Sequence, residues 1–385
     1  MLCAIIGRET NLAYAEIESV LGDFEKIGSD CVVFQNKNNT PPDINKFGSV
    51  IKLAKVIEHL ENDTDINTII PGLLLTIARE KGIASLDFGI SIYGKNISHK
   101  TYKKLLISSK KYLANYNIKS RFVESKKYIL NAAQIKHNKL ITNGIELMIA
   151  FSKNNAFIGE TYAVQDIDAY SIRDYGRPCR DMKVGMFPPK LAQSMIHIAK
   201  VQEDAIVYDP FCGSGIVLQE ALLQNIEAWG SDISENMVKC SGLNLKWLQN
   251  NFSTIKQFKL FNADATKLTI VPDTKYHIVT EGYLGSPLHQ IPNTDDIRCF
   301  RNQLSPIYLD FLRSIKQASR LPEGIVLALP CWKKSGGLDC LNIIDQIRNL
   351  GYTINQFQSV PYDKVIYKRD NQIVGRQIIS LKTNK

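Results

Sequence analysis

The sequence lacks the features of disulfide-rich, metal-binding and membrane proteins. Its eight cysteines are scattered and form no C-x-x-C pair, which argues against a disulfide framework and against a zinc knuckle. No stretch approaches about eighteen apolar residues, and the N-terminus has no basic region before it reaches Arg8, Glu9 and Glu16. We therefore expect a cytoplasmic chain that folds without disulfides, holds no metal and enters no membrane.

The length and the apolar content suit two or three ordinary domains, since the chain has 385 residues of which 44% are hydrophobic. In the first part of the chain short strands and helices alternate, a rhythm typical of small α+β modules. Apolar spacing predicts helices over residues 12–22, around 50–60, over 66–82 and 99–115, and helical structure over 128–140. Residues 165–190 contain few apolar residues and three prolines, which indicates an ordered connector between domains.

The positive charge of the chain is concentrated in one segment. Between Lys95 and Lys139 there are twelve Lys and Arg residues and one acid, Glu124, a net of +11; the whole chain carries +9, so the remaining residues sum to −2. Such a run is either a solvated surface or a contact for a polyanion. Aromatic residues lie among the charges, as in surfaces that grip phosphates and stack on bases. The candidate phosphate contacts are Lys110, Lys111, Arg121, Lys126 and Lys127.

In the second half, helices and short apolar strands alternate from about residue 190 onward. This alternation predicts a parallel sheet covered by helices on both faces, an α/β fold of the Rossmann-like type. Two closing strands at residues 352–360 and 372–381 predict a hairpin, which would add an antiparallel edge strand to the sheet.

The strongest motif is the turn Asp209-Pro-Phe-Cys-Gly-Ser-Gly215, which follows the apolar strand AIVY and precedes a helix. Its glycines allow the backbone to approach a ligand at the carboxyl end of the first strand, where open α/β sheets bind their ligands. A dinucleotide site is the rival interpretation, but the third position of G-x-G-x-x-G is Leu218. The carboxylate of Asp209 would repel a pyrophosphate, whereas it suits the cationic amino group of S-adenosylmethionine.

Two further acids follow the next strands. Asp232 ends the second strand, 23 residues after Asp209, where a carboxylate can accept hydrogen bonds from both ribose hydroxyls. Asp264 ends the third strand and could accept from an adenine amino group, although Asp-Ala before a helix is also an ordinary N-cap. The fourth strand ends at Thr280 and leads into Glu281-Gly-Tyr-Leu284, where we expect catalytic residues.

Several segments together resemble the THUMP-domain RNA methyltransferases, specifically the tRNA guanine-N2 methyltransferases. The segments of the second half are Arg177-Pro178, GMFPPKLA at 185–192, DPFCGSG and the closing YKRDNQIVGRQI. Those of the first half are FGISIYG, KSRFV, AAQIKHNKL and FIGETYAVQDIDAYSIRD. The resemblance covers nearly the whole chain. It implies an N-terminal ferredoxin-like α+β subdomain at 1–60, a THUMP RNA-binding domain at 61–163, a linker at 164–184 and a class I methyltransferase domain at 185–385.

The resemblance also implies S-adenosylmethionine as methyl donor, tRNA as substrate with guanosine ten or six as the target, and in some relatives a small activating protein partner. It places Met186–Lys190 over the methionine part of the cofactor, although GMFPP is also an ordinary helix start. The candidate cofactor residues are Phe187, Pro188, Asp209, Phe211, Gly213, Gly215, Asp232, Ile233, Asp264 and Ala265.

The candidate catalytic residues are Glu281, Gly282 and Tyr283, which depart from the pattern of that family. There the fourth strand ends in Asp or Asn followed by Pro-Pro and an aromatic residue. We expect Glu281 to accept a hydrogen bond from the target amine, a carbonyl near Gly282 to accept a second, and Tyr283 to stack on the flipped base. Two alternatives stay open: a DNA adenine-N6 or cytosine-N4 methyltransferase, and a tRNA-binding protein that keeps the fold without catalysis.

Overall fold

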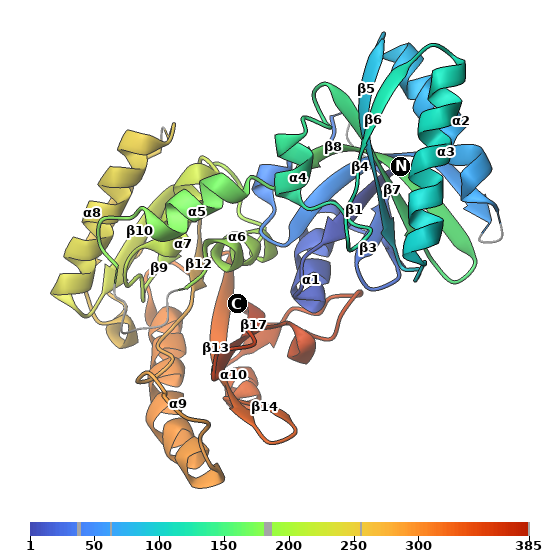
Figure 1. Cartoon of the computed structure of the whole chain (residues 1–385). Helices are drawn as coiled ribbons and strands as arrows, with labels where there is room; N and C mark the ends of the chain where they lie inside the picture. Colours follow the sequence, from blue (N-terminus) through green and yellow to red (C-terminus); the bar gives the residue numbers. More distant parts are fainter. Residues whose placement is uncertain (37–39, 62–63, 181–186, 255, 384–385) are drawn as a thin grey trace. The chain divides into compact units, whose positions relative to one another are not determined.

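The computed structural model describes residues 1–36, 40–61, 64–180, 187–254 and 256–383, and the chain divides into two compact units (Figure 1). The first unit comprises residues 1–10, 23–45 and 50–167. The second comprises residues 11–22, 46–49 and 168 onward. The chain therefore enters the second unit twice before it stays there.

The first unit is built on one mixed sheet of eight described strands. Its order is β2-β3-β1-β4-β8-β7-β5-β6, in which β5 pairs in parallel with β6 and β7 and the other pairs are antiparallel. The strands are β1 (Leu2–Ile6), β2 (Glu25–Ile27), β3 (Cys31–Phe34), β4 (Val50–Glu61), β5 (Ser85–Tyr93), β6 (Lys119–Val123), β7 (Gly144–Phe151) and β8 (Asn155–Val164). Strands from the predicted N-terminal subdomain and from the predicted THUMP domain thus share a sheet, because β4 pairs with both β1 and β8.

The helices of the first unit are α2 (Ile66–Glu80), α3 (His99–Asn115) and α4 (Ala132–His137). The side chains of Asp65 and Ser98 cap the first turns of α2 and α3 and so fix where these helices begin. The two helices pack on each other and bury their apolar faces in one core with β5 and β7 (Figure 1). The Lys-rich face of α3 is left outward, because Tyr102, Leu105 and Leu113 occupy its buried side.

The predicted helix around residues 50–60 is wrong, since this segment is strand β4. Its sequence, VIKLAKVIEHL, can be read with either a helical or an alternating period. The strand is favoured because β4 finds partners along both edges, β1 on one and β8 on the other. Lys52 is buried because of this pairing, whereas a helix would place it in solvent.

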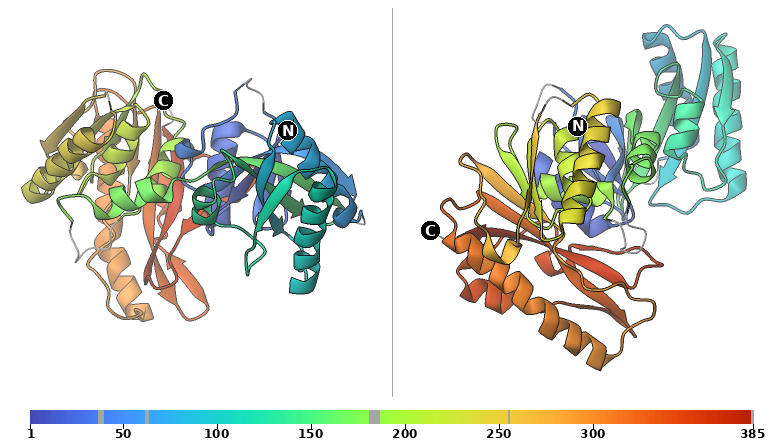
Figure 2. Two further views of the ribbon diagram at one scale, coloured as in Figure 1. Left: turned by 45° about the horizontal axis from the view of Figure 1, so that its top comes forward. Right: turned by 90° about the vertical axis from the view of Figure 1, so that its left-hand side faces the viewer.

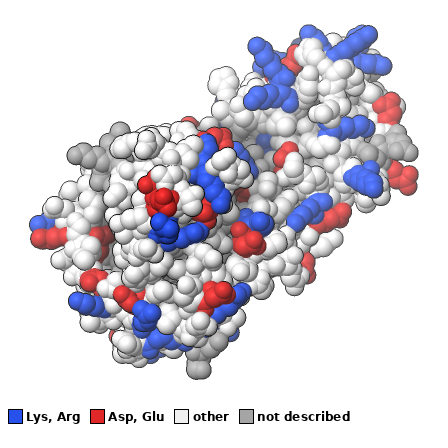
Figure 3. Space-filling view, turned by 90° about the horizontal axis from the view of Figure 1, so that it is seen from below, with Lys and Arg blue, Asp and Glu red and all other residues white. Residues whose placement is uncertain are grey.

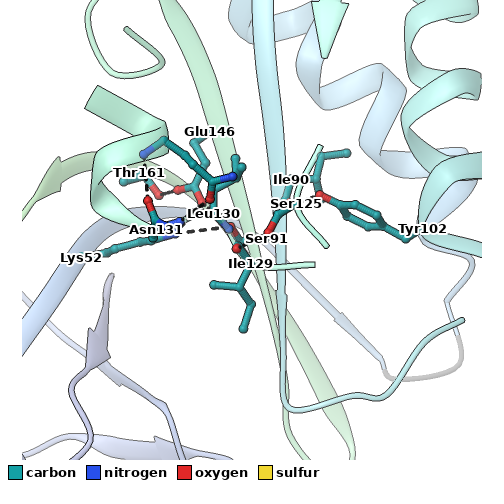
Figure 4. A network of polar contacts seen from close by, with 11 residues as sticks. Lys52, Ile90, Ser91, Tyr102, Ser125, Ile129, Leu130, Asn131, Glu146 and Thr161 are labelled. Atoms are coloured by element: carbon teal, nitrogen blue, oxygen red, sulfur yellow. Dashed lines mark hydrogen bonds and ion pairs between the residues drawn. The ribbon is translucent and has the colours of Figure 1, made fainter. Parts of the chain in front are cut away.

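A cluster of polar side chains lies inside the first unit (Figure 4). The ammonium of Lys52 on β4 lies 2.7 Å from a carboxylate oxygen of Glu146 on β7, and both residues are fully buried. The hydroxyls of Ser91 and Thr161 also donate to Glu146, and the Ser91 hydroxyl accepts from the backbone N–H of Leu130. Each of these buried polar groups has a hydrogen-bond partner on another strand. The cluster therefore helps to specify how strands β4, β5, β7 and β8 align.

Replacing Lys52 with methionine should lower the free energy of unfolding of the first unit by about 3–5 kcal/mol, because Glu146 is left as an uncompensated buried charge. The measurement is urea unfolding. Lys81→Met is the matched control, since its pair with Glu160 is partly exposed and should contribute less than about 1 kcal/mol. Equal losses for the two variants would contradict a special role of the buried pair.

The second unit is built on a mixed sheet of nine described strands. Its main order is β11-β10-β9-β12-β13-β17-β15, with β14 pairing to β13 and β16 to β17. Strands β9 to β13 run parallel, and β17 is antiparallel to its neighbours. The strands are β9 (Ile206–Asp209), β10 (Glu227–Asp232), β11 (Phe258–Asn262), β12 (Tyr276–Thr280), β13 (Gly324–Lys334), β14 (Gly337–Cys340), β15 (Tyr352–Ile354), β16 (Ile366–Tyr367) and β17 (Val374–Thr383). The strand order reverses between β9 and β12, which is where open α/β sheets bind ligands.

Helices cover both faces of this sheet, as the sequence predicts. Helices α6, α7 and α8 pack in series on one face, and α9 and α10 pack together on the other (Figure 2, right). The helices are α1 (Thr10–Leu21), α5 (Ile167–Tyr175), α6 (Pro189–Ile198), α7 (Ile216–Leu223), α8 (Glu235–Asn251), α9 (Thr294–Gln317) and α10 (Ile344–Asn349). Single 3₁₀ turns occur at Ile44–Lys46, Ala265–Lys267 and Tyr362–Lys364. The core under α9 joins Tyr208, Leu304 and Phe311.

Helix α1 belongs to the second unit although it lies near the start of the chain. Its fully buried Glu16 accepts hydrogen bonds from the backbone N–H groups of Gly48 and Ser49, each at 2.9 Å, and lies 2.7 Å from Nδ1 of His197 on α6. Burial alone would raise the pKa of Glu16, but His197 and these donors lower it below its usual value. An ionised Glu16 therefore fastens α1 to α6.

Several local predictions for the second half need correction. The expected connector contains helix α5, and a hairpin between β13 and β14 was missed. The expectation of no disulfides is wrong as well: Cys179 is bonded to Cys240, and Cys331 to Cys340. The spacing of the cysteines in the sequence indicated neither pair. Cys179 meets Cys240 because the tertiary structure brings it to α8, and Cys331 faces Cys340 across the hairpin that was not predicted.

None of the described helices is both long and apolar enough to cross a bilayer. Among the described residues there is also no group of three or more His, Cys, Asp or Glu side chains placed to hold a metal ion.

Candidate cofactor and catalytic site

Four predicted site residues meet at the carboxyl edge of the second sheet. Register pairs Asp209 with Gly230, two residues before Asp232, and pairs Tyr208 with Ile278, three residues before Glu281. Asp264 follows β11, whose last residue, Asn262, pairs with Asp232. Because the carboxyl ends of β9, β10, β11 and β12 lie side by side, the sheet brings these acids to one edge beside the point where the strand order reverses.

The Gly-rich turn has the backbone conformation that its glycines allow. Gly213 and Gly215 have φ values of +49° and +84°, in the left-handed region that side chains disfavour. A Cβ at Gly215 would lie 2.3 Å from the hydroxyl of Ser241 on α8. The backbone conformation at both positions, and the close packing of Gly215 against α8, therefore favour glycine. Helix α7 begins directly after this turn.

Asp209 is a buried carboxylate beside other acids. It accepts a hydrogen bond from the backbone N–H of Phe211 at 3.0 Å and another from Thr280. Burial raises its pKa to about 7, and the charges of Asp232 and Glu281 add to this rise. No Lys or Arg among the described residues forms an ion pair with Asp209. The site thus holds a carboxylate whose charged form would be stabilised by a cation.

Asp232 joins the second strand end to the Gly-rich turn. One of its carboxylate oxygens accepts from the backbone N–H of Gly213 at 2.9 Å, and the other from the N–H of Ser234, also at 2.9 Å. Its backbone carbonyl accepts from the side-chain amide of Asn262. Each carboxylate oxygen has a further lone pair beyond these contacts, so Asp232 can accept ligand hydroxyls as well.

We expect Asp232→Ala to lower the affinity for a nucleoside cofactor at least about tenfold, because charge-assisted hydrogen bonds contribute about 1.5–3 kcal/mol each. Calorimetry with S-adenosylmethionine measures this. Since the carboxylate also orders Gly213, Asp232→Asn serves as a second variant that retains one acceptor oxygen. Unchanged affinity in both variants would refute the ribose assignment.

The residues beside these acids lie in different environments. The side chain of Asp264 caps the 3₁₀ turn Ala265–Lys267 through bonds to the N–H and hydroxyl of Thr266, which also lower the pKa of Asp264. Ala265 is buried. Ile233 is 73% exposed, unusual for a large aliphatic side chain directly after Asp232. An exposed apolar surface beside the strand ends is available to a flat ring.

The aromatic residues and prolines predicted to contact the cofactor pack into the protein. The Phe211 ring meets that of Phe311 on α9 edge to face, with centroids 5.2 Å apart. Phe187 is buried, and Pro188 is the residue from which α6 begins, with Pro189 in its first turn. Gly185 and Met186 lie outside the described residues.

The loop after β12 is held in a defined conformation. Gly282 has a φ of +73°, and its backbone N–H donates to the Thr280 hydroxyl at 3.3 Å. A Cβ at this position would lie 2.7 Å from the Tyr308 hydroxyl, so only glycine fits. Tyr308 in turn donates to the carbonyl of Tyr283 at 3.0 Å. The Tyr283 ring itself is 47% exposed and is accessible to a partner.

Sequence reasoning missed two residues that contact this loop, Arg376 on β17 and Tyr308 on α9. Nε of Arg376 lies 2.6 Å from a carboxylate oxygen of Glu281, and the arginine side chain is only 3% exposed. The segment containing Arg376 stood out in the sequence, but nothing in it indicated a partner about a hundred positions earlier. Tyr308 lay within an ordinary amphipathic helix pattern and gave no signal.

The predicted phosphate contacts all lie on the surface of the first unit, where Figure 3 shows Lys and Arg side chains gathered over part of that unit. Lys110 and Lys111 are exposed on α3, and Lys126 and Lys127 are exposed in the turn after β6. Arg121 differs, since it donates two hydrogen bonds to Asp87 on the neighbouring strand, which raises its pKa. Its charge is therefore partly balanced within the unit.

Parts of the chain are similar to known methyltransferases. Residues 32–242, more than half of the chain, match a family model described as DNA methylase. A tRNA (guanine(10)-N2)-dimethyltransferase of Methanocaldococcus jannaschii is 33% identical over 107 residues, 26% of this chain and 29% of that protein. The protein of the same name from Methanothermobacter thermautotrophicus is 34% identical over 101 residues, 24% of this chain and 29% of that protein. The chain thus matches less than a third of the length of these curated relatives.

Two solved structures share the fold over nearly their whole length. TrmN from Thermus thermophilus matches with a TM-score of 0.53 at 15% identity, covering 100% of this chain and 99% of that one. A possible methylase from Clostridium difficile 630 matches with a TM-score of 0.51 at 13% identity, covering 100% and 98%. These likenesses confirm the predicted fold, a Rossmann-like α/β sheet preceded by an α+β region.

Proposed function

This chain belongs to the DNA methylase family, and on that premise we propose that it is a tRNA methyltransferase, which transfers a methyl group from S-adenosylmethionine to the exocyclic N2 of a guanosine. The observation that carries the proposal is the meeting of Asp209, Asp232 and Glu281 at one sheet edge. The names of the archaeal relatives favour guanosine ten, with position six as the alternative. With tRNA as substrate, the cytoplasm is the compartment we propose.

The residues present suit this cofactor. Asp209 is a buried carboxylate that lacks an ion-pair partner among the described cations, and it complements an ammonium group. Asp232 offers acceptors to ribose hydroxyls, and Asp264 and Ile233 lie beside it for an adenine ring. Gly213 and Gly215 keep side chains out of the turn, and Phe187, Pro188, Phe211 and Ala265 complete the surroundings we propose.

Glu281 and its loop supply the chemistry of the acceptor. S-adenosylmethionine provides a methyl group on a sulfonium sulfur, so the lone pair of the guanine N2 forms the new C–N bond while the C–S electron pair returns to sulfur and one N2 proton departs. The guanine amine is a poor nucleophile, so orientation carries much of the rate. Glu281 accepts a hydrogen bond from N2, stabilises the developing positive charge and passes the departing proton to water.

Two backbone and ring features of the loop complement Glu281. In this proposal a carbonyl near Gly282 accepts a second amine hydrogen, and Tyr283, which is exposed, stacks on a base that has left its helix. Residues 281–284 therefore act together on the target base, although both prolines of the family pattern are absent. Restraint by Tyr308 and Thr280 replaces the stiffness that proline would give.

The first unit is proposed as the RNA-docking part. The domains we propose are a ferredoxin-like subdomain at 1–60, of which residues 11–22 and 46–49 belong to the second unit, a THUMP domain at 61–163, a linker at 164–184 and a methyltransferase domain at 185–385. Support comes from the exposed lysines on α3 and after β6, and from the presence of only one acid, Glu124, among the twelve Lys and Arg residues between Lys95 and Lys139. A small activating protein is a further partner that the family resemblance suggests, and it stays a prediction.

Lys110→Ala combined with Lys111→Ala should weaken RNA binding across sequences and lower the slope of log affinity against log salt by about two, since about one counterion contact is lost per lysine. Fluorescence anisotropy at several salt concentrations measures this. Lys239→Ala on α8 is the matched control, because this exposed lysine pairs with Glu235. An unchanged slope in the double variant would mean that these lysines are only solvated surface.

A DNA amino methyltransferase is the second candidate, and the description of the family model favours it. Both reactions methylate an exocyclic amine and would use the same three carboxylates. They differ in the polymer that the enzyme accepts.

The deciding experiment incubates the purified protein with radiolabelled S-adenosylmethionine and either unmodified tRNA transcripts or duplex DNA, followed by digestion and identification of the nucleoside. N2-methylguanosine is the expected product. Label in DNA adenine or cytosine would support the second candidate. Cofactor and tRNA binding without any label would indicate a protein that has lost catalysis.

A further inference from the structure

Arg376 places a nearly inaccessible guanidinium against a proposed reacting group of the second unit, Glu281. Its Nε lies 2.6 Å from Oε1 of Glu281, while Nη1 lies 3.4 Å from both the side-chain oxygen of Gln372 and the carbonyl of Val374. Only 3% of the arginine side chain is exposed, compared with 20% for Glu281. The guanidinium is thus fixed, and the carboxylate is the part that still has access to solvent.

The strand arrangement explains why this contact exists. Arg376 pairs with Pro330 across β13 and β17, and β13 pairs in parallel with β12, which leads into Glu281. Asp would be one methylene shorter at position 281, whereas the glutamate side chain reaches across β13 to the arginine. The departure from the Asp or Asn of the family pattern therefore coincides with a partner that anchors the longer side chain.

We propose that Arg376 is a positioning residue, which holds Glu281 ionised and leaves one carboxylate oxygen directed at the target amine. This inference rests on the proposed function. The geometry assigns the two oxygens different tasks, because one is bound end-on to Nε of the arginine and the other is available to the substrate. Arg376 thus favours the ionised form of Glu281, which is the form that can accept a hydrogen bond and a proton from the amine.

The charged and titratable groups around Glu281 support this role. Burial raises the pKa of Glu281, and Arg376 opposes that rise through its charge and its hydrogen bond. From β9, Asp209 faces Glu281 as a like charge, and the charge of Glu281 raises the pKa of Asp209. From α9, the Tyr308 hydroxyl lies nearby, and burial keeps it protonated by raising its pKa. Among these groups, Arg376 is the cation that favours the charged form of Glu281, against the effect of burial.

The experiment compares the wild type with Arg376→Gln and Arg376→Lys in the pH dependence of kcat for methyl transfer to tRNA. We expect the acid limb of the Arg376→Gln profile to move upward by at least about one pH unit, so that the rate at a pH on that limb falls about tenfold or more. Arg376→Lys keeps a positive charge and should restore most of the shift. Arg173→Gln is the control for stability, because it removes a comparably buried arginine from its pair with Glu220 without touching the loop.

A second measurement does not depend on activity. Carboxyl-detected NMR of protein labelled at the glutamate side chains, with Glu281→Gln to identify the signal, gives the pKa of Glu281 directly in the wild type and in Arg376→Gln. A higher pKa in Arg376→Gln supports the proposal even if no RNA is methylated, which would overturn only the proposed function. The same pKa and the same acid limb in both proteins, with a loss of thermal stability alone, would overturn the positioning role.

Discussion

Changing Glu281 to glutamine is expected to lower kcat for methyl transfer by about 10²–10⁴-fold while leaving cofactor affinity nearly unchanged. The amide keeps an oxygen that can accept from Arg376, so the loop should retain its shape. It can neither carry the negative charge that stabilises the methylated amine nor take its proton. Single-turnover rates with tRNA and calorimetry with S-adenosylmethionine together measure the two parts of this prediction.

Two further substitutions separate chemistry from folding at this position. Glu281→Ala would leave the Arg376 guanidinium buried without its carboxylate and should also lower the free energy of unfolding, by about 3–5 kcal/mol. Gly282→Ala forces a Cβ against Tyr308 and should disturb the loop while leaving the carboxylate in place. If Glu281→Gln kept full activity, the catalytic role of this carboxylate would be wrong, whatever the outcome of the other two.

Changing Asp209 to asparagine is expected to have two large and opposite effects. Affinity for S-adenosylmethionine should fall about 100-fold, because a charge-assisted contact to the cofactor's ammonium is lost from a buried site. The cofactor-free protein should become more stable at pH 8, by up to about 4 kcal/mol, because the pKa of Asp209 rises on folding from 3.8 to about 7 and each unit of that rise corresponds to about 1.4 kcal/mol.

The pH dependence of both effects follows from the same raised pKa. Since folded Asp209 holds its proton more tightly than the unfolded chain does, its contribution to stability is fully present below about pH 4 and is lost as the pH rises to about 7. Cofactor affinity should change in the opposite sense, falling about tenfold per pH unit below pH 7, because the ammonium needs the ionised form. Calorimetry from pH 5.5 to 8.5 tests this, and equal slopes for wild type and Asp209→Asn would contradict it.

Strong local patterns were enough to predict the sheet of the second unit and the placement of its acids. Asp209 and Asp232 each end a short apolar strand, and parallel strands bring such ends together without further information. Segment 50–60 shows the limit, because its apolar spacing fits two periods and only pairing with β1 and β8 selects the strand. The two disulfides were missed for a similar reason, since their cysteines meet only through tertiary structure.

The sequence predicted the residues of the candidate site that follow the parallel strands, but not those that contact them from β17 and α9. Glu281 could be found because it follows a strand that leads to the ligand edge, whereas Arg376 and Tyr308 reach it from β17 and α9. A single sequence does not show which distant side chain approaches a loop. Residues that act directly on a ligand are thus easier to predict than those that hold them in place.

The position of helix α1 has a consequence for dividing the protein into fragments. A gene fragment that begins at residue 164 would encode the proposed linker and methyltransferase domain, but would omit α1 and the segment 46–49. It would leave His197 and Ser194 without the carboxylate of Glu16 that they contact. Proteolysis or recombination at the apparent domain boundary should therefore yield an unstable second half. In evolution this half could be inherited separately only together with α1, whose codons lie near the start of the gene.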